Sequence, residues 1–339
     1  MIRDEASFGA FLDAVRKFVR DKAIPREAEV EQTGEIPDVG TNTGIGSEGL
    51  VVDGTEEQKK RYLPRLASGE WTSCLAITEP EAGSEASNVR TMARRDGDSF
   101  ILDGEKRYIT NAPIADVFTI TARTEPGTKG AKGVSAFIVE RGTPGLVSGK
   151  PYRKMGQAGS PVGSVFLDSC RIPASSIIGG VEGAGFATVM KALNKQRIHL
   201  AALSTGPAMR MLELAVDHAR TRVQFGQPVA QHQLVQALIA DCQTEIFAAR
   251  SMILETARKR DRGEDVVLEA SMCKYFATEM CGRVADRCVQ IFGGAGYVAD
   301  YAPIERWFRD VRLFRLYEGT SQIHQLNIAR LTLNRTPSP

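Results

Sequence analysis

The strongest constraint on the fold is the order of three sequence patterns along the chain: the pattern is typical of helices at both ends and of strands between them. In residues 7–22, apolar side chains recur at the spacing of one helix face, and Pro25 is expected to end that helix. Residues 71–178 hold short β-rich runs divided by Gly, Pro, Asp and Asn. From about residue 184, long helical patterns return. Helices, strands and helices in separate runs predict an α+β fold with segregated layers rather than a βαβ sheet.

Local patterns refine this outline. Thr55-Glu-Glu-Gln58 has the capping-box spacing and predicts a second helix that ends at about residue 67. The predicted strands lie at 74–77, 99–109, 117–123, 134–140 and 164–172. The predicted long helices lie at 184–222, 229–262 and 266–291, and a last one follows Gly319. These changes between helical and strand-like patterns predict three domains, at 1–70, 71–178 and 179–339.

The bulk composition excludes several classes of protein. The chain has 339 residues and a formal net charge of +2, without the basic excess of a protein that neutralises nucleic-acid phosphates. No apolar stretch approaches the roughly 20 residues that span a bilayer, and the charged N-terminus does not resemble a secretory signal. The six cysteines form no Cys-x-x-Cys pair. We therefore expect reduced core thiols, no nucleic-acid or membrane partner, and a bacterial-type cytoplasmic location, or the mitochondrial matrix if a leader has been removed.

Some motifs are misleading. Gly44-Ile-Gly46-Ser-Glu-Gly49 matches a dinucleotide-binding fingerprint, but the polar residues before it cannot be a buried parallel strand, so we interpret it as a glycine-rich loop. No G-x-S-x-G motif of a hydrolase occurs. The four histidines have no metal-ligand spacing, and we expect no metal site.

Three polar segments are not explained by periodicity. The stretch from Ala76 to Ser84 leaves a strand with hydroxyls and a glycine, which is typical of a plain loop or of a site for a phosphate or ring edge. Three glycines follow Gln290 after a helix, as in a helix C-cap. Leu316-Tyr-Glu318-Gly-Thr-Ser-Gln322 places a carboxylate and two hydroxyls before a helix, as in an ordinary N-cap. Taken singly, each structural interpretation is at least as good as a functional one.

Together and in this order, the three segments resemble the acyl-CoA dehydrogenase family over nearly the whole chain. Further matching stretches are Tyr62-Leu-Pro-Arg-Leu-Ala-Ser-Gly-Glu70, Tyr108-Ile-Thr-Asn111, Arg222-Val-Gln-Phe-Gly226 and Arg309-Asp310. The resemblance implies an N-terminal helical domain, a middle antiparallel β-domain and a C-terminal four-helix bundle. It also implies FAD-dependent α,β-dehydrogenation of an acyl-CoA thioester, in which a base takes the α-proton and the β-hydrogen leaves as hydride to the flavin N5.

The resemblance assigns the roles of individual residues. Glu318 matches the base, and Gln196 stands where some relatives carry a second carboxylate. The FAD-binding matches are Thr78, Ser84, Tyr108, Thr110, Arg222, Phe225, Gln290, Gly294, Thr320 and Gln322. The substrate-binding matches are Ser84, Arg197 and Gly319. Because Arg222 and Phe225 match residues that the family supplies from an adjacent subunit, the resemblance implies a homotetramer built from dimers, with electron-transferring flavoprotein as the electron partner.

The chain departs from the family pattern near its N-terminus. Relatives carry roughly forty more residues between Asp38 and Asn42, including helices that wall the acyl pocket. Either a segment is missing around Asp38 to Thr41 or the deletion is genuine, and we predict a hidden break. Two alternatives to the dehydrogenase remain open: an oxidase-type relative that uses dioxygen, and a flavin-binding scaffold without activity.

Overall fold

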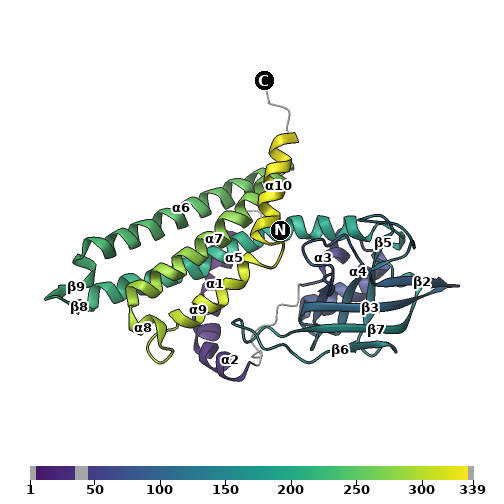
Figure 1. Ribbon diagram of the computed structural model, residues 1–339, viewed down its shortest axis with the longest axis horizontal. Helices are drawn as coiled ribbons and strands as arrows, with labels where there is room; N and C mark the ends of the chain where they lie inside the picture. The colour runs from purple at the N-terminus through teal and green to yellow at the C-terminus, as the bar shows by residue number, and fades with distance from the viewer. Residues whose placement is uncertain (1–4, 35–44, 335–339) are drawn as a thin grey trace. The chain divides into compact units, whose positions relative to one another are not determined.

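The computed structural model describes residues 5–34 and 45–334. The chain forms two compact units, Met1–Val189 and Met190–Pro339, and each is considered by itself. Figure 1 shows that the first holds the β-sheet and that the second is helical. This alternation confirms the predicted α+β fold with a β-domain and a helical C-terminal region. The domain boundaries derived from the sequence remain predictions.

The N-terminal helices are less regular than predicted. Helix α1 (Glu5–Phe18) ends before Pro25, and a π-helical turn (Val19–Ala23) follows it. Pro25 lies inside a 3-10 turn (Ile24–Arg26) that leads into α2 (Glu27–Thr33), so the prediction that Pro25 ends the helix was wrong. Proline is tolerated there because the first turn of a helix does not use its backbone N–H groups. The predicted break around Asp38 to Thr41 lies outside the described residues.

Two short helices pack on the sheet. Helix α3 (Glu48–Asp53) precedes α4 (Glu56–Ser68), which opens with the predicted capping box: Thr55 accepts from the Gln58 backbone, and the Gln58 side chain accepts from the Thr55 backbone. These helices join strands β4 and β5 in one apolar cluster, whose members are Leu50, Tyr62, Leu66, Val117, Ala136, Ile138 and Ile178. One face of the sheet is thereby covered.

The sheet contains all five predicted strands and two that the sequence did not indicate. The predicted ones are β1 (Ser73–Ala76), β3 (Ser99–Thr110), β4 (Val117–Arg123), β5 (Val134–Glu140) and β7 (Val162–Pro173). The additional ones are β2 (Met92–Asp96) and β6 (Leu146–Ser148). The order is β1-β4-β2-β3-β7-β6, with β5 beside β4. The long β3–β7 and β4–β5 ladders are antiparallel, while β1 runs parallel to β4.

The second unit is a helical bundle. Its long helices are α5 (Gly185–Thr221), which begins in the first unit, α6 (Gln233–Asp261), α7 (Val267–Phe292) and α10 (Ser321–Asn334). Between them lie the hairpin strands β8 (Val223–Gln224) and β9 (Gln227–Pro228), and the short helices α8 (Gly294–Tyr297) and α9 (Ile304–Val311). The core is rich in small side chains such as Ala201, Ala215 and Ala277, so the helices can approach closely. Figure 1 shows α6 beside α7 along most of its length.

Three further expectations concerned the cysteines, membrane-spanning helices and metal sites. All six cysteines are buried free thiols, which confirms the prediction of reduced core cysteines. Within residues 5–34 and 45–334, no helix is long and apolar enough to cross a membrane. Over the same residues, no three His, Cys, Asp or Glu side chains are grouped so that they could hold a metal ion.

Candidate active site

Glu318 lies in the short loop that precedes α10. The Thr320 hydroxyl accepts a hydrogen bond of 3.3 Å from the Ile323 backbone N–H, so of the two hydroxyls expected before this helix, at Thr320 and Ser321, the one of Thr320 is the cap. Glu318 has a φ of 56° and Gly319 a φ of 89°, so two consecutive residues adopt left-handed conformations. Glycine is suited to this geometry, whereas a glutamate in it is held there by its surroundings.

Two buried side chains hold the carbonyl groups of this loop. The Lys274 ammonium on α7 donates to the Gly319 carbonyl at 2.7 Å, and Nε2 of His324 on α10 lies 3.1 Å from the Glu318 carbonyl. A carbonyl only accepts, so His324 carries its proton on Nε2. Burial, together with the charges of Lys274 and Arg197, lowers the pKa of His324 to about 4, so the ring is neutral at pH 7. A Cβ atom on Gly319 would lie 3.1 Å from Nε2 of His324, which explains glycine at this position.

The Glu318 side chain is partly buried and feels two positive charges. Its Oε2 atom is buried and has no hydrogen-bond partner among the described residues. Burial raises the pKa of Glu318, and the positive charges of Arg197 and Lys274 oppose the rise. Burial lowers the pKa of Lys274 to about 8 and also lowers the pKa of Arg197. None of the hydrogen bonds among the described residues uses the backbone N–H of Glu318, so this donor is available to a ligand.

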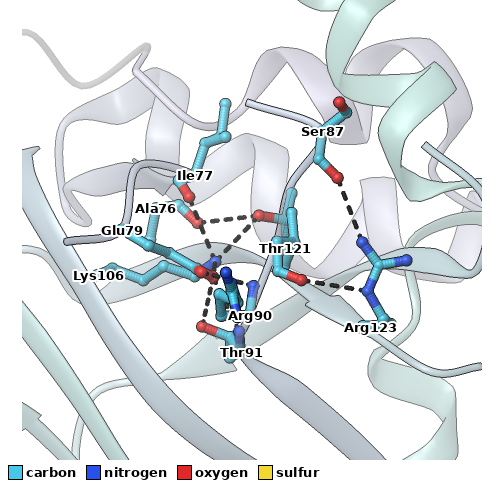
Figure 2. Close-up of polar contacts among 10 residues, drawn as sticks. Ala76, Ile77, Glu79, Ser87, Arg90, Thr91, Lys106, Thr121 and Arg123 are labelled. Atoms are coloured by element: carbon cyan, nitrogen blue, oxygen red, sulfur yellow. Dashed lines mark hydrogen bonds and ion pairs between the residues drawn. The ribbon is translucent and has the colours of Figure 1, made fainter. Parts of the chain in front are cut away.

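A buried ion pair fixes the polar loop after β1. Figure 2 shows the Lys106 ammonium from β3 pointing toward Glu79 in this loop, at 2.6 Å. Glu79 also accepts from the Arg90 backbone at 2.6 Å, and from the backbone and hydroxyl of Thr91 at 3.0 and 2.6 Å. Lys106 donates further to the Ile77 carbonyl and the Thr121 hydroxyl. Since both side chains are almost fully buried, the pair locks the loop to the sheet.

Four of the predicted cofactor-binding residues belong to the first unit: Thr78 and Ser84 in this loop, and Tyr108 and Thr110 in β3. The Arg107 backbone N–H donates to the Thr78 carbonyl at 2.8 Å, which places Thr78 beside the end of β3. A register shift between Lys106 and Ile109 marks a bulge in β3, where Tyr108 has a φ of 58° and is 67% exposed. The hydroxyls of Thr78, Ser84 and Thr110 make no hydrogen bond to any described residue. Polar side chains without partners beside an exposed ring fit a ligand that carries both polar groups and an aromatic system.

A second group lies at the far end of the bundle from Glu318. Phe225 stands at the tip of the β8–β9 hairpin, with a φ of 52° and 95% of its surface exposed, and Arg222 precedes it. The His218 ring stacks on Phe292 at 4.3 Å, so this hairpin adjoins the end of α7, where Gln290 and Gly294 lie. Arg197 and Thr221 are 24 residues apart on α5, or about 36 Å at the helical rise. Within one chain, Arg222 and Phe225 therefore do not share a site with Arg197.

Three of the predicted site residues have strained backbone conformations. Six non-glycine residues of the described chain have positive φ, and Tyr108, Phe225 and Glu318 are three of them. For bulky side chains this conformation is costly and is typically kept where function needs it. Each unit by itself offers an exposed aromatic ring with polar side chains near it in the chain, which is the chemistry that a dinucleotide with a ring system, such as FAD, would need.

Four buried residues near these loops were missed by the sequence analysis. Lys274 and His324 contact the loop of Glu318, and the pair of Glu79 and Lys106 fixes the loop of Thr78. A lysine within the apolar positions of 266–291 was the available signal for Lys274, because a charge among buried positions needs a partner. The sequence contains no comparable signal for His324.

A helical region, a β-domain and a helical C-terminal region, with a buried carboxylate before the last helix, make up the three-domain fold of flavin-dependent oxidoreductases that act on CH–CH bonds. The chain belongs to the acyl-CoA dehydrogenase family. Three family profiles match it: "Acyl-CoA dehydrogenase, N-terminal domain" at residues 38–70, "middle domain" at 74–170 and "C-terminal domain" at 183–333. This confirms the resemblance derived from the sequence.

Individual relatives support the same assignment. An acyl-CoA dehydrogenase of Bacillus subtilis is 41% identical over 295 residues, which cover 87% of this chain and 77% of the relative. An acryloyl-CoA reductase (NADH) of Anaerotignum propionicum is 42% identical over 293 residues, which cover 86% of this chain and 74% of the relative. The crystal structure of an acyl-CoA dehydrogenase from Geobacillus kaustophilus matches with a TM-score of 0.92 and 31% identity, over 98% of this chain and 99% of that one.

Proposed function

We propose that this chain binds FAD and desaturates an acyl-CoA thioester between its α and β carbons, with Glu318 as the base. The observation that carries the proposal is the buried Oε2 atom of Glu318, which has no partner among the described residues. An oxygen in this state can accept a proton from a substrate without first giving up a hydrogen bond to the protein. Gln196 next to Arg197 offers no second carboxylate.

The surroundings of Glu318 suit the removal of a weakly acidic α-proton. Burial raises the pKa of Glu318 and makes it a stronger base near neutral pH, while Arg197 and Lys274 limit the rise. The free backbone N–H of Glu318 is a donor for the thioester oxygen, on which negative charge develops as the proton leaves. In this proposal Ser84, Arg197 and Gly319 contact the substrate.

The cofactor would be held by both groups of residues described above. FAD, when bound, accepts the hydride that leaves the β carbon. Thr78, Ser84 and Thr110 offer hydroxyl donors, and Tyr108 offers an exposed ring. Arg222 presents the fork of donors that a pyrophosphate favours, next to the exposed ring of Phe225. The other residues proposed to bind FAD are Gln290, Gly294, Thr320 and Gln322.

The length of α5 supports a site shared between chains. Arg222 and Phe225 are about 36 Å along the helix from Arg197, so in a complete site they would have to come from a neighbouring copy of the chain. The 95% exposure of Phe225 supports this reading, because a hairpin tip that presents a bare aromatic ring is suited to insert into a partner. We therefore propose a homo-oligomer, a homotetramer built from dimers as in the family.

The electron partner and the direction of the reaction are further parts of the proposal. We propose electron-transferring flavoprotein as the acceptor, with dioxygen as the alternative for an oxidase-type relative. The similarity to an acryloyl-CoA reductase supports a second candidate, reduction of an enoyl-CoA. Burial favours the protonated form of Glu318, and in that form the carboxyl group can donate the α-proton. Assays with an electron-accepting dye, with dioxygen and with NADH distinguish these possibilities.

The variant Glu318→Gln tests the proposed base. Glutamine keeps the shape of the side chain but cannot take the proton, so we expect flavin reduction by acyl-CoA to slow by about 10²–10⁴-fold or more, with FAD content preserved. Stopped-flow bleaching of the oxidised flavin measures the chemical step directly, across a panel of acyl chain lengths. Glu213→Gln, an exposed carboxylate on α5, is the matched control and should reduce the flavin at the normal rate. Normal bleaching in Glu318→Gln would exclude the proposed role.

A further inference from the structure

Lys274 is a buried cation that the proposed chemistry uses only as one of two charges that limit the pKa of Glu318. Its side chain is fully buried on α7, and no carboxylate of the described residues lies within 4.0 Å of its ammonium. Its hydrogen bond instead goes to the carbonyl of Gly319, at 2.7 Å. A buried ammonium without an ion pair costs stability, so its position against this loop calls for an explanation beyond packing.

The loop that Lys274 contacts is the one that carries the proposed base. Glu318 and Gly319 have φ angles of 56° and 89°, and their carbonyls accept hydrogen bonds from His324 and Lys274, respectively. Two donors on two different helices thus hold two consecutive carbonyls. A left-handed glutamate persists only when its surroundings determine its conformation, and these two hydrogen bonds hold the carbonyls on both sides of the Glu318–Gly319 peptide step.

We propose that Lys274 is the positioning residue of the catalytic base: it holds the left-handed Glu318–Gly319 loop through the Gly319 carbonyl and places a fixed positive charge beside the Glu318 carboxylate. This inference rests on the proposed function, in which Glu318 removes the α-proton. Lys274 does not contact the reacting atoms and acts only through Glu318.

The charges around Lys274 and Glu318 come from each helix that packs at this loop. Arg197 on α5 is a second cation that acts on both residues. Glu279, one turn further along α7, bonds to Arg315 and the Ser321 hydroxyl, and acts on Lys274 at longer range. His324 on α10 is neutral. Lys274 is therefore the cation that both donates a hydrogen bond to the loop and acts electrostatically on Glu318. Its charge lowers the pKa of Glu318.

The test measures the loop and the carboxyl group in the absence of substrate. Lys274→Met keeps the shape of the side chain and removes both the donor and the charge. We expect amide hydrogen exchange in the 316–321 segment to accelerate by about tenfold or more, because a hydrogen bond to a charged donor is lost. We also expect the pKa of Glu318 to rise. Infrared titration of the protonated carboxyl band measures it, with Glu318→Gln identifying the band.

Thr278→Val is the matched control. Thr278 is buried one turn after Lys274 on the same helix, and its hydroxyl bonds to the Lys274 carbonyl, so the variant loosens the same region without touching the loop. It should change neither loop exchange nor the Glu318 carboxyl. Lys274→Gln removes the charge but keeps a donor. It should raise the Glu318 pKa as Lys274→Met does, but amide hydrogen exchange of the loop should be slower than in Lys274→Met. If Lys274→Met does not fold, Lys274→Gln takes its place in the test.

The two readouts decide the inference independently of turnover. Unchanged exchange of the loop and an unchanged Glu318 titration in Lys274→Met would overturn it, as would changes of equal size in Thr278→Val. A different outcome is that none of the acyl-CoA substrates tested reduces the flavin of the wild-type protein, while Lys274→Met still alters both readouts. In that case the proposed function fails, and the positioning of Glu318 by Lys274 stands.

Discussion

The buried pair of Lys106 and Glu79 allows the stability of the sheet unit to be perturbed in a calculable way. In Lys106→Met, the Glu79 carboxylate keeps its three donors from Arg90 and Thr91 but loses its cation. Removing one partner of a buried ion pair costs about 3–5 kcal/mol. The carboxylate can limit the cost by taking up a proton. At pH 7 this uptake costs about 3.7 kcal/mol, from an ordinary glutamate pKa of about 4.3 and about 1.36 kcal/mol per pH unit.

The cost of protonating Glu79 sets both the size and the pH dependence of the stability loss in Lys106→Met. At pH 7 we expect the free energy of unfolding of the first unit to fall by about 3–4 kcal/mol. In the wild type, Lys106 and the hydrogen bonds hold the pKa of Glu79 below its ordinary value despite burial, so their stabilisation is present above that value. In the variant the charge and hydrogen bond of Lys106 are gone, while burial and the hydrogen bonds from Thr91 remain, so the pKa of Glu79 rises relative to the wild type. The deficit should therefore shrink to about 1 kcal/mol near pH 5, where protonation is cheap.

Tryptophan fluorescence can isolate the unit concerned. The chain has two tryptophans: Trp71 packs against the apolar cluster of Leu50, Tyr62 and Leu66 on the sheet, and Trp307 lies in the second unit. Urea unfolding in a Trp307→Phe background therefore reports on the first unit. Glu79→Gln combined with Lys106→Met removes both charges and should recover most of the loss at pH 7. A deficit below about 1 kcal/mol at pH 7, or one that stays constant down to pH 5, would refute the reasoning.

Two further predictions follow from the bundle. If the site is shared between chains, the variants Glu318→Gln and Arg222→Ala are each inactive alone, but mixed oligomers of the two regain activity. Some sites in the mixture then combine an unaltered Glu318 from one chain with an unaltered Arg222 from another. Absence of recovery in mixtures shown to exchange subunits would exclude a shared site. Burial lowers the pKa of His324 to about 4, so the unfolded chain binds more protons between about pH 6.5 and 4, and the free energy of unfolding should fall by about 3 kcal/mol across that window. His324→Gln should flatten this dependence, as measured by urea unfolding followed through Trp307, and an unchanged slope would refute it.

Most helices and strands of this protein could be predicted from residues that are close together in the sequence. The capping box at Thr55, the N-cap at Thr320 and the strands of 117–123 and 134–140 each depend on side chains a few positions apart, and the structure confirms them. Strand β2 was missed because its sequence, Met-Ala-Arg-Arg-Asp, has almost no apolar alternation and is held by its ladder with β3. Pro25 was misjudged because a 3-10 turn can accept proline at its start.

The sequence also identified Glu318 as the candidate base, through motifs in the right order, but it could not reveal what surrounds that carboxylate. Lys274 lies 44 residues before Glu318 and Arg197 lies still earlier, and only the packing of α5, α7 and α10 brings them to one loop. The buried Oε2 atom, the left-handed backbone and the neutral His324 are properties of that assembly. Periodicity and capping are short-range and are written in the local sequence. Desolvation and long-range hydrogen bonds arise only when distant segments pack together, so the tertiary structure alone decided the chemistry of this carboxylate.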